Sequence, residues 1–417
     1  MDRVFGRTAT WRVALIVLIP FGIGFFLSNY YRSMNAVLSP RLMFDLQLSA
    51  TDLGLLTSIY FFTTAVCQLP LGLLMDRYGP RRVQASLMAL ATLGLLIFAV
   101  GRNLPVLILG RAIMGIGAAG ALMTSFQAVM LWFPVQRWPL LNGLVLSAGG
   151  LGALTATLPT ELVLQVIDWR HLMFGTALAS LAGCAILFGV APERSSEGTA
   201  EKPSGQIRGV VQVYSDRLFL RISPLYATTV GGNLAFQGLW AGPWLKDVAH
   251  FSTTQVARSL LVVTVLQTVG YVVVGWLAGI LGKRGVGLAQ IIGTGTLLFI
   301  ISQCGLLLAT GQARWVVLLG MGLFSNINLL SYPLLAQNLP AGLMGRANTA
   351  LNFFVFLGAF LLQYAVGAII GMFDPVATSS YPAIAYQTAF ALILFLQAAS
   401  WVWFLVPAKA SSLCAIH

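Results

Sequence analysis

Long apolar runs separated by short polar segments follow one another along the chain. A membrane-spanning helix needs about 20 mostly apolar residues, because the hydrocarbon core is about 30 Å thick. The pattern predicts about twelve transmembrane helices and an all-α integral membrane protein. The predicted helices begin near Val13, Leu53, Val83, Pro105, Leu140, Arg170, Ile222, Thr254, Val286, Arg314, Arg346 and Ala383.

One connection, residues 192–221, is long and rich in Ser, Glu, Gly and Pro, which is typical of a flexible linker. It follows the sixth predicted helix. We therefore expect a six-helix bundle over residues 1–191, a cytoplasmic linker over 192–221 and a second six-helix bundle over 222–417.

The two halves carry a weak internal repeat. Gly72 and Gly79 follow the second predicted helix, and Gly275 and Gly282 follow the eighth at the same spacing, each pair leading into basic residues. Repeated halves with a site between them are the usual construction of secondary transporters, so we expect two pseudo-symmetric bundles.

Composition supports a membrane environment. Hydrophobic residues make up 58% of the chain and charged residues 9%, whereas soluble domains have about 45–50% and about 25%.

The net charge of +12 is explained by topology. With the N-terminus in the cytoplasm, 16 of the 24 Lys and Arg residues fall in cytoplasmic segments and 6 in outer segments. We expect a multi-pass protein with both termini cytoplasmic and no nucleic-acid partner. The sequence shows no cleavable signal peptide, which favours a bacterial inner membrane.

The sequence offers no pattern typical of an enzyme. The four cysteines have no metal-binding or disulfide spacing, and no Ser/His/Asp or phosphate-loop constellation is present. We expect no metal, no cofactor and no enzymatic activity, and we expect a monomer.

Several motifs resemble those of the major facilitator superfamily. The first is Gly72-xxx-Asp76-Arg77-x-Gly79-x-Arg81-Arg82, and others are Arg111-xxx-Gly115-x-Gly117, Trp132-Phe133-Pro134-xx-Arg137, Asp168-Trp169-Arg170 and Gly345-Arg346-Ala347. The resemblance implies alternating access, with the first motif acting as a latch on the cytoplasmic side. In the second half Gly279 replaces the latch acid. The gating residues we predict are Gly72, Asp76, Arg77, Gly79, Arg81, Arg82, Arg111 and Arg346.

Two further stretches, Tyr31-Arg32 and Gln68-Leu-Pro70-Leu-Gly72, look like the organic anion:cation symporter branch, which includes sugar-acid permeases. In that branch the arginine of the first helix binds the substrate carboxylate. Tyr31 and Ala118 replace two acids that the branch uses for proton coupling, so we do not expect that coupling route. Residues 147–152 lack the helix 5 proline of drug:proton antiporters, which disfavours multidrug efflux.

Three charged residues lie within predicted helices. A charge at bilayer depth costs at least about 2.5–3.5 kcal/mol, so it normally faces a cavity or a partner. Arg32 either binds an anion or extends to the outer headgroups. Arg111 serves either gating or a structural contact with backbone carbonyls of a neighbouring helix. Glu161 is the candidate coupling residue; the alternative is that it caps a helix or forms an ion pair at the outer surface, for which Arg170 is a candidate partner.

Polar and aromatic residues complete the expected pocket. Asn233, Gln237 and Trp240 recur at i, i+4 and i+7, which predicts one shared helical face. The alternatives are hydrogen bonding between helices and, for Trp240 and Trp244, an outer aromatic belt. The predicted substrate-binding set is Arg32, Asn29, Tyr30, Asn35, Gln127, Asn233, Gln237, Trp240, Gln267, Tyr271, Asn328 and Tyr332.

The leading functional hypothesis is a secondary active transporter, operating as a symporter, for a small organic anion of carboxylate or sugar-acid type. An exporter or exchanger of neutral or amphipathic molecules is the first alternative. A membrane-embedded sensor with a transporter fold is the second. The pattern leaves the coupling ion open.

Overall fold

The computed structural model describes residues 7–134, 137–193, 211–308, 313–340, 343–375 and 380–406. In this described part, eleven helices are long and apolar enough to cross a membrane. A twelfth helical run extends without a gap over residues 217–247. The predicted fold class, an all-helical membrane protein, is confirmed.

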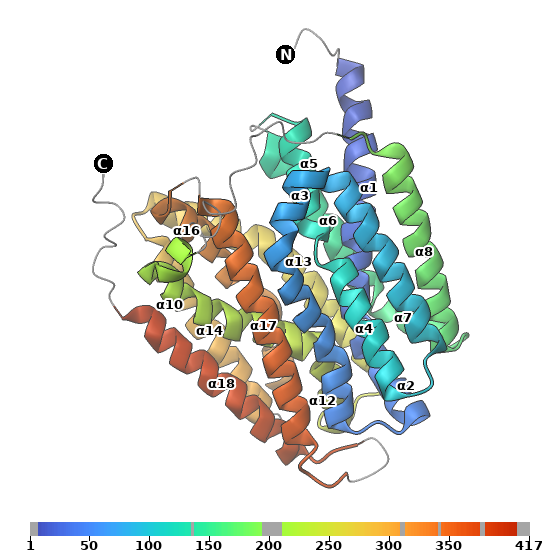
Figure 1. Ribbon diagram of the computed structural model, residues 1–417. Coiled ribbons are helices and arrows are strands. Elements are labelled where there is room, and N and C mark those ends of the chain that lie inside the picture. The colour runs from blue at the N-terminus through green and yellow to red at the C-terminus, as the bar shows by residue number, and fades with distance from the viewer. Residues whose placement is uncertain are drawn as a thin grey trace. The chain divides into compact units, whose positions relative to one another are not determined.

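The first half of the chain forms α1 to α8 (Figure 1). Asn103 and Asp168 cap α4 and α8 by accepting a backbone N–H in the first turn. The eight helices are α1 (Arg7–Ser33), α2 (Asn35–Leu46), α3 (Ala50–Val100), α4 (Leu104–Ala118), α5 (Ala121–Trp132), α6 (Trp138–Thr155), α7 (Leu158–Leu164) and α8 (Trp169–Val190).

Helix α3 contains two candidate spans, Ala50–Gln68 and Arg77–Val100. The helix is interrupted near the start of the second span, at Gly79, whose φ of 76° and ψ of 158° are not helical. Only glycine adopts this backbone conformation without strain, which explains why the sequence motif places glycine there.

The second half begins at Arg217, inside the expected linker, because the Asp216 carboxylate accepts the Phe219 N–H at 2.9 Å and caps the helix there. Two five-residue π-helical stretches interrupt the run to Asp247. The elements are α10 (Arg217–Tyr226), η2 (Ala227–Gly231), α11 (Gly232–Ala235), η3 (Phe236–Trp240), α12 (Ala241–Asp247), α13 (Thr253–Lys283), α14 (Leu288–Leu308), α15 (Ala313–Phe324), η4 (Ile327–Leu330), α16 (Ser331–Asn338), α17 (Met344–Ile370) and α18 (Ala383–Leu405).

The chain forms two compact units. Unit 1 comprises Met1–Leu38 and Phe62–Ala200, and unit 2 comprises Ser39–Phe61 and Glu201–His417. The start of α3 therefore packs with the second half of the chain, which the sequence pattern did not anticipate. The expected division of the chain at residues 192–221 stays a prediction.

Within unit 1, α1 packs against α5, α6 and α8, and the second span of α3 packs closely on α4. A Cβ atom on Gly117 of α4 would lie 2.4 Å from the backbone nitrogen of Ala91 and 2.5 Å from the carbonyl oxygen of Leu87. The absence of a side chain lets the two backbones approach, as is common between membrane helices.

Within unit 2, α14 packs against α15 and α18, and α17 packs against η2 and α11. Glycines again permit the contact. A Cβ atom on Gly231 would lie 2.8 Å from the Ala359 nitrogen, and one on Gly358 would lie 2.6 Å from the Ala227 carbonyl oxygen. The first π-helical stretch is therefore held directly against the backbone of α17.

Candidate transport site

Arg32 lies in the last turn of α1, in unit 1, and is half-buried. Its Nη2 donates to Oδ1 of Asn29 at 2.6 Å, and Nδ2 of Asn29 donates to the Phe25 carbonyl at 2.9 Å. Among the described residues no carboxylate forms an ion pair with Arg32. The guanidinium is thus oriented by a neutral amide.

The residues around Arg32 are closely packed. The Tyr30 hydroxyl accepts a hydrogen bond from Thr160 of α7 at 3.1 Å. A Cβ atom on Gly149 of α6 would lie 2.8 Å from Nδ2 of Asn29, so α6 approaches this face of α1 closely. Asn35 is buried at the start of α2. Helix α6 and the bond to the Phe25 carbonyl restrict the Asn29 side chain, which in turn accepts from Arg32.

Gln127 of α5 also belongs to unit 1. Its Oε1 atom is buried and has no hydrogen-bond partner in the described part of the chain. No contact joins Gln127 to Arg32, so its place in the substrate-binding set stays a prediction.

Arg111 is 2% exposed and makes the backbone contact expected of a structural arginine. Its Nη1 donates to the Tyr31 carbonyl oxygen at 3.3 Å, and its guanidinium carbon lies 6.0 Å from the centre of the Phe98 ring. Because Tyr31 immediately precedes Arg32, this bond ties the end of α1 to α4.

Glu161 lies in the first turn of α7 and is 2% exposed. The alternative that it pairs with Arg170 at the surface is wrong. Arg170 instead donates through Nη2 to the Gly101 carbonyl at 3.2 Å and stacks on Trp169, with 4.1 Å from guanidinium carbon to ring centre. Glu161 is buried and stays the predicted coupling residue within unit 1.

The arginines of the predicted latch contact an acid that the sequence analysis missed. Nη2 of Arg81 and Nε of Arg82 lie 3.1 Å and 3.0 Å from the Glu193 carboxylate, and Nη1 of Arg81 donates to the Ala191 carbonyl at 3.0 Å. In the sequence, Glu193 is an acid that directly follows the sixth apolar run, and this position could have suggested it as a partner for the arginines.

The other gating residues lie apart from this ion pair. Arg77 is exposed and lies over the Tyr78 ring, Gly72 has open space beside it, and Arg346 is half-buried in the first turn of α17. The side chain of Asp76 lies outside the described part, so the latch that we expect around it stays a prediction.

In unit 2, the expectation that Asn233, Gln237 and Trp240 share one face is wrong. Gln237 donates to Thr264 of α13 at 3.4 Å, whereas the Trp240 indole donates to the Gln363 carbonyl of α17 at 3.1 Å. The reason is the π-helical stretch η3, which holds more residues per turn than an α-helix and breaks the assumed spacing.

The proposed aromatic belt is also wrong for these tryptophans. Trp240 and Trp244 are 1% and 0% exposed, so both lie inside unit 2.

Tyr332 and Asn328 form side-chain bonds between helices, whereas Gln267 accepts one only through its backbone carbonyl. Nδ2 of Asn326 donates to the Gln267 carbonyl at 2.6 Å, and the Tyr332 hydroxyl donates to Oδ1 of Asn352 at 2.6 Å. Oδ1 of Asn328 accepts from Thr296 at 3.1 Å. The Tyr271 side chain lies outside the described part. The structure thus favours an interhelical role for these groups.

Several amide atoms in unit 2 are buried without a hydrogen-bond partner in the described part of the chain. An unpaired buried polar atom costs about 1–3 kcal/mol, so such atoms are candidates to bind water or a polar substrate. Two of the residues, Gln363 and Gln397, were not predicted. The atoms are Oδ1 of Asn233, Nε2 of Gln267, Nδ2 of Asn328, Oε1 of Gln363 and Oε1 of Gln397.

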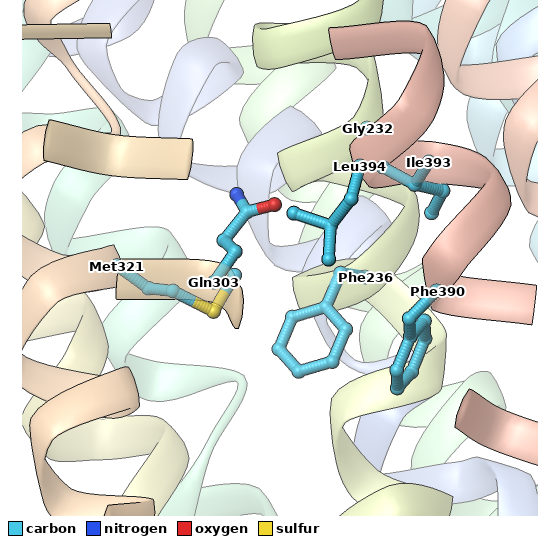
Figure 2. A pocket seen from close by; sticks show the side chains of 7 residues that line it. All are labelled: Gly232, Phe236, Gln303, Met321, Phe390, Ile393 and Leu394. Atoms are coloured by element: carbon cyan, nitrogen blue, oxygen red, sulfur yellow. The ribbon is translucent and has the colours of Figure 1, made fainter. Parts of the chain in front are cut away.

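A small cavity lies inside unit 2, beside α11 and η3, and the Gln303 amide points into it (Figure 2). Its volume, about 10 Å³ of space for the centre of a water-sized molecule, is close to that needed for a single water. It is therefore too small for an organic substrate. The lining residues are Gly232, Phe236, Gln303, Met321, Phe390, Ile393 and Leu394. The described residues contain no cluster of acidic, His and Cys side chains suited to a metal ion.

Long apolar helices with buried arginines and amides define the class of the protein as a polytopic α-helical membrane protein. The profile of the Major Facilitator Superfamily matches residues 21–363, and the chain belongs to that family.

Individual relatives are distant. The chain is 32% identical over 151 residues to the uncharacterized transporter YybO of Bacillus subtilis (strain 168), covering 35% of this chain and 34% of YybO. It is 24% identical over 273 residues to the probable sulfoacetate transporter SauU of Cupriavidus necator, covering 62% and 63%. It is 27% identical over 188 residues to the efflux pump hmp6 of Hypomyces subiculosus, covering 44% and 33%. The matched region thus spans from about a third to just under two thirds of these relatives.

Solved structures share the fold. A bacterial homologue of the human lysosomal transporter Spinster superposes with a TM-score of 0.76 at 15% identity, covering 94% of this chain and 96% of that one. At this identity the similarity shows the fold alone.

Proposed function

We propose that this protein moves a small organic anion, of carboxylate or sugar-acid type, across the membrane by alternating access. The observation that carries the proposal is the Arg32 guanidinium, which is half-buried, oriented by Asn29 and not paired with an acid in the described part of the chain. A planar guanidinium matches a carboxylate or sulfonate through paired hydrogen bonds, and an anion would neutralise it.

One relative supports this chemistry through its name. SauU is named for sulfoacetate, a small molecule with a carboxylate and a sulfonate. We propose that residues 1–191 and 222–417 form the two moving halves, that both termini are cytoplasmic, and that the protein works as a symporter in a bacterial inner membrane.

Export of neutral or amphipathic molecules is the second candidate. It is favoured by the relative hmp6, which is named an efflux pump. In this case Arg32 has a structural role, and substrates bind without regard to their charge.

The two candidates are separated by a ligand thermal-shift screen on purified wild type, Arg32→Gln and the control Arg102→Gln. Arg102 is exposed, so its substitution removes a charge without touching the candidate site. The panel contains carboxylates, sugar acids, sulfonates, neutral sugars and amphipathic cations. A ligand at about 100 times its Kd adds about 2.7 kcal/mol of stability.

We expect anions to stabilise wild type and Arg102→Gln but not Arg32→Gln. Equal stabilisation of all three proteins by neutral or cationic compounds would instead establish the second candidate.

A further inference from the structure

The start of α3 is seated in unit 2 through small residues. A Cβ atom on Gly54 would lie 3.1 Å from Cα of Gly367 in α17, and one on Gly371 would lie 2.2 Å from the Thr51 hydroxyl. Oγ1 of Thr51 donates to the Gly367 carbonyl at 3.4 Å, and Trp240 packs against both Gly54 and Gly367. This contact depends on close backbone approach and has little polar bonding of its own.

A hydrogen-bonded chain at the adjoining end of α12 supplies the polar part of this contact. The Ala50 N–H, at the start of α3, donates to the Tyr381 hydroxyl at 3.1 Å. The Tyr381 N–H donates to Oδ2 of Asp247 at 3.1 Å, and the Tyr386 hydroxyl donates to the same oxygen at 2.6 Å. Asp247 is therefore linked to the first residue of α3 through Tyr381.

The geometry leaves room for a proton. The Tyr381 N–H and the Tyr386 hydroxyl both bond Oδ2, and the Ser380 side chain adds a hydrogen bond to the carboxyl. A serine hydroxyl can accept as well as donate, so Oδ1 can carry a hydrogen while Oδ2 goes on accepting. The protonated carboxyl thus fits the same arrangement as the carboxylate. Asp247 is the last residue of the helical run 217–247, and its side chain is half-buried.

The groups around Asp247 are few and mostly neutral. α18 contributes Tyr386, and the segment before α18 contributes Tyr381 and Ser380. α3 contributes the uncharged Ala50 N–H through Tyr381, and its first turn also carries Asp52, whose carboxylate accepts hydrogen bonds from Ser49. Lys246, exposed on the same helix as Asp247, is the nearby cation.

Three other charged or titratable groups lie on adjoining segments but are exposed to solvent. Arg258 belongs to α13, His250 precedes that helix, and Asp374 follows α17.

These surroundings favour the neutral acid. Burial raises the pKa of the Asp247 carboxyl above its ordinary value, and the hydrogen bonds and the charge of Lys246 offset only part of that effect. When the start of α3 lies on unit 2, the carboxyl is buried and has the higher pKa, so this state binds the proton more tightly and is favoured as the pH falls. For each pKa unit between the buried and the hydrated carboxyl, protonation shifts the equilibrium between the seated and the released α3 start about tenfold.

We propose that Asp247 is a proton-binding site, and that a proton bound there holds the start of α3 on unit 2. Deprotonation favours release of the α3 start, because the carboxylate is then better solvated by water. With the topology proposed above, the proton arrives from the outer side. The inference rests on membership of a transporter family and is independent of the anion proposed for Arg32.

The test measures the distance between spin labels at Gln47→Cys and Met372→Cys by double electron–electron resonance, after the four native cysteines have been replaced. Both side chains are exposed in unit 2, one just before α3 and the other just after α17. Spectra are recorded from about pH 4 to about pH 8. The lower limit lies near the ordinary pKa of Asp, and the range extends upward because burial raises the pKa of Asp247. The probe is the proton itself, so no substrate is needed.

In the wild type, we expect a longer-distance population that grows as the pH rises. Asp247→Asn mimics the neutral acid and should keep the short distance at every pH, whereas Asp374→Asn, an exposed acid after α17, should behave as the wild type. A wild-type distance distribution that does not change with pH, or an unchanged pH response in Asp247→Asn, would overturn the proposal.

A second variant covers the case in which Asp247→Asn does not fold. Tyr381→Phe removes the hydroxyl that accepts the Ala50 N–H and leaves the carboxyl in place. We expect its pH response to be smaller than that of the wild type, and an undiminished response would contradict the link through Tyr381.

Discussion

At the scale of single residues, the two arginines within the helices of unit 1 have different surroundings. Arg111 is buried and donates to a backbone carbonyl of α1, while Arg32 is half-buried and bonded to a neutral amide. The sequence located both within helices but did not distinguish their roles, because the hydropathy pattern says where a charge lies and not which atom it meets.

The structural role of Arg111 is testable by Arg111→Gln. The substitution removes a charge-assisted hydrogen bond to the Tyr31 carbonyl, and hydrogen bonds to charged groups contribute about 1.5–3 kcal/mol. We expect a lower apparent Tm in detergent, together with weaker anion binding because the end of α1 loosens. Arg102→Gln is the matched control and should leave the Tm unchanged. An unchanged Tm in Arg111→Gln would show that the bond is dispensable.

At the scale of helices, the hydrophobic pattern predicted the spans well. Predicted starts at Val13, Leu140 and Ala383 coincide with the candidate spans found in the structure. The pattern did not reveal the π-helical stretches, because one extra residue in a turn leaves the mean hydropathy of the segment unchanged. It also gave no reason to seat the start of α3 in unit 2, since that contact depends on glycines that look alike along the chain.

The close contact between α3 and α4 predicts a marked effect of Gly117→Ala. The added methyl would meet backbone atoms of Ala91 and Leu87, which cannot turn aside as a side chain does. We expect a loss of about 1–3 kcal/mol, the usual cost of overpacking, seen as a lower apparent Tm. Gly175→Ala in α8 is the control. It has open space and should be neutral or stabilise by up to about 1 kcal/mol through helix propensity. Equal Tm values for the two variants would contradict the packing argument.

At the scale of the whole molecule, transport requires contacts that form and break during the cycle. The motif resemblance predicted a charge cluster after the second span, and the structure adds its acid, Glu193, at the end of the first half. The sequence predicted the arginines because their spacing is characteristic. It did not predict Glu193 as their partner, because 111 residues separate Glu193 from Arg82 along the chain.

Glu193→Gln tests the importance of this cluster for transport. The pair is partly exposed, so we expect less than about 1 kcal/mol of lost stability. We expect uptake into reconstituted vesicles to fall by about twofold to thirtyfold, corresponding to about 0.5–2 kcal/mol of conformational coupling. The substrate is the anion that gives the largest thermal shift, and Asp374→Asn controls for the loss of an exposed acid. Wild-type uptake by Glu193→Gln would rule out a role in gating.

The π-helical stretches η2 and η3 have a consequence for how this helix can change by insertion and deletion. Each stretch holds residues beyond the α-helical count in an otherwise continuous run. Deleting one residue within Ala227–Gly231 would let that turn relax to α-helix, and the helix after the deletion would keep nearly the same orientation, because the wide turn had absorbed the extra residue. Asn233, Trp240 and Asp247 would then keep their neighbours. The same deletion in a regular α-helical turn would rotate the following helix by about 100°, so the π-helical stretches are the places where this segment can lose a residue without changing which groups face the transport path.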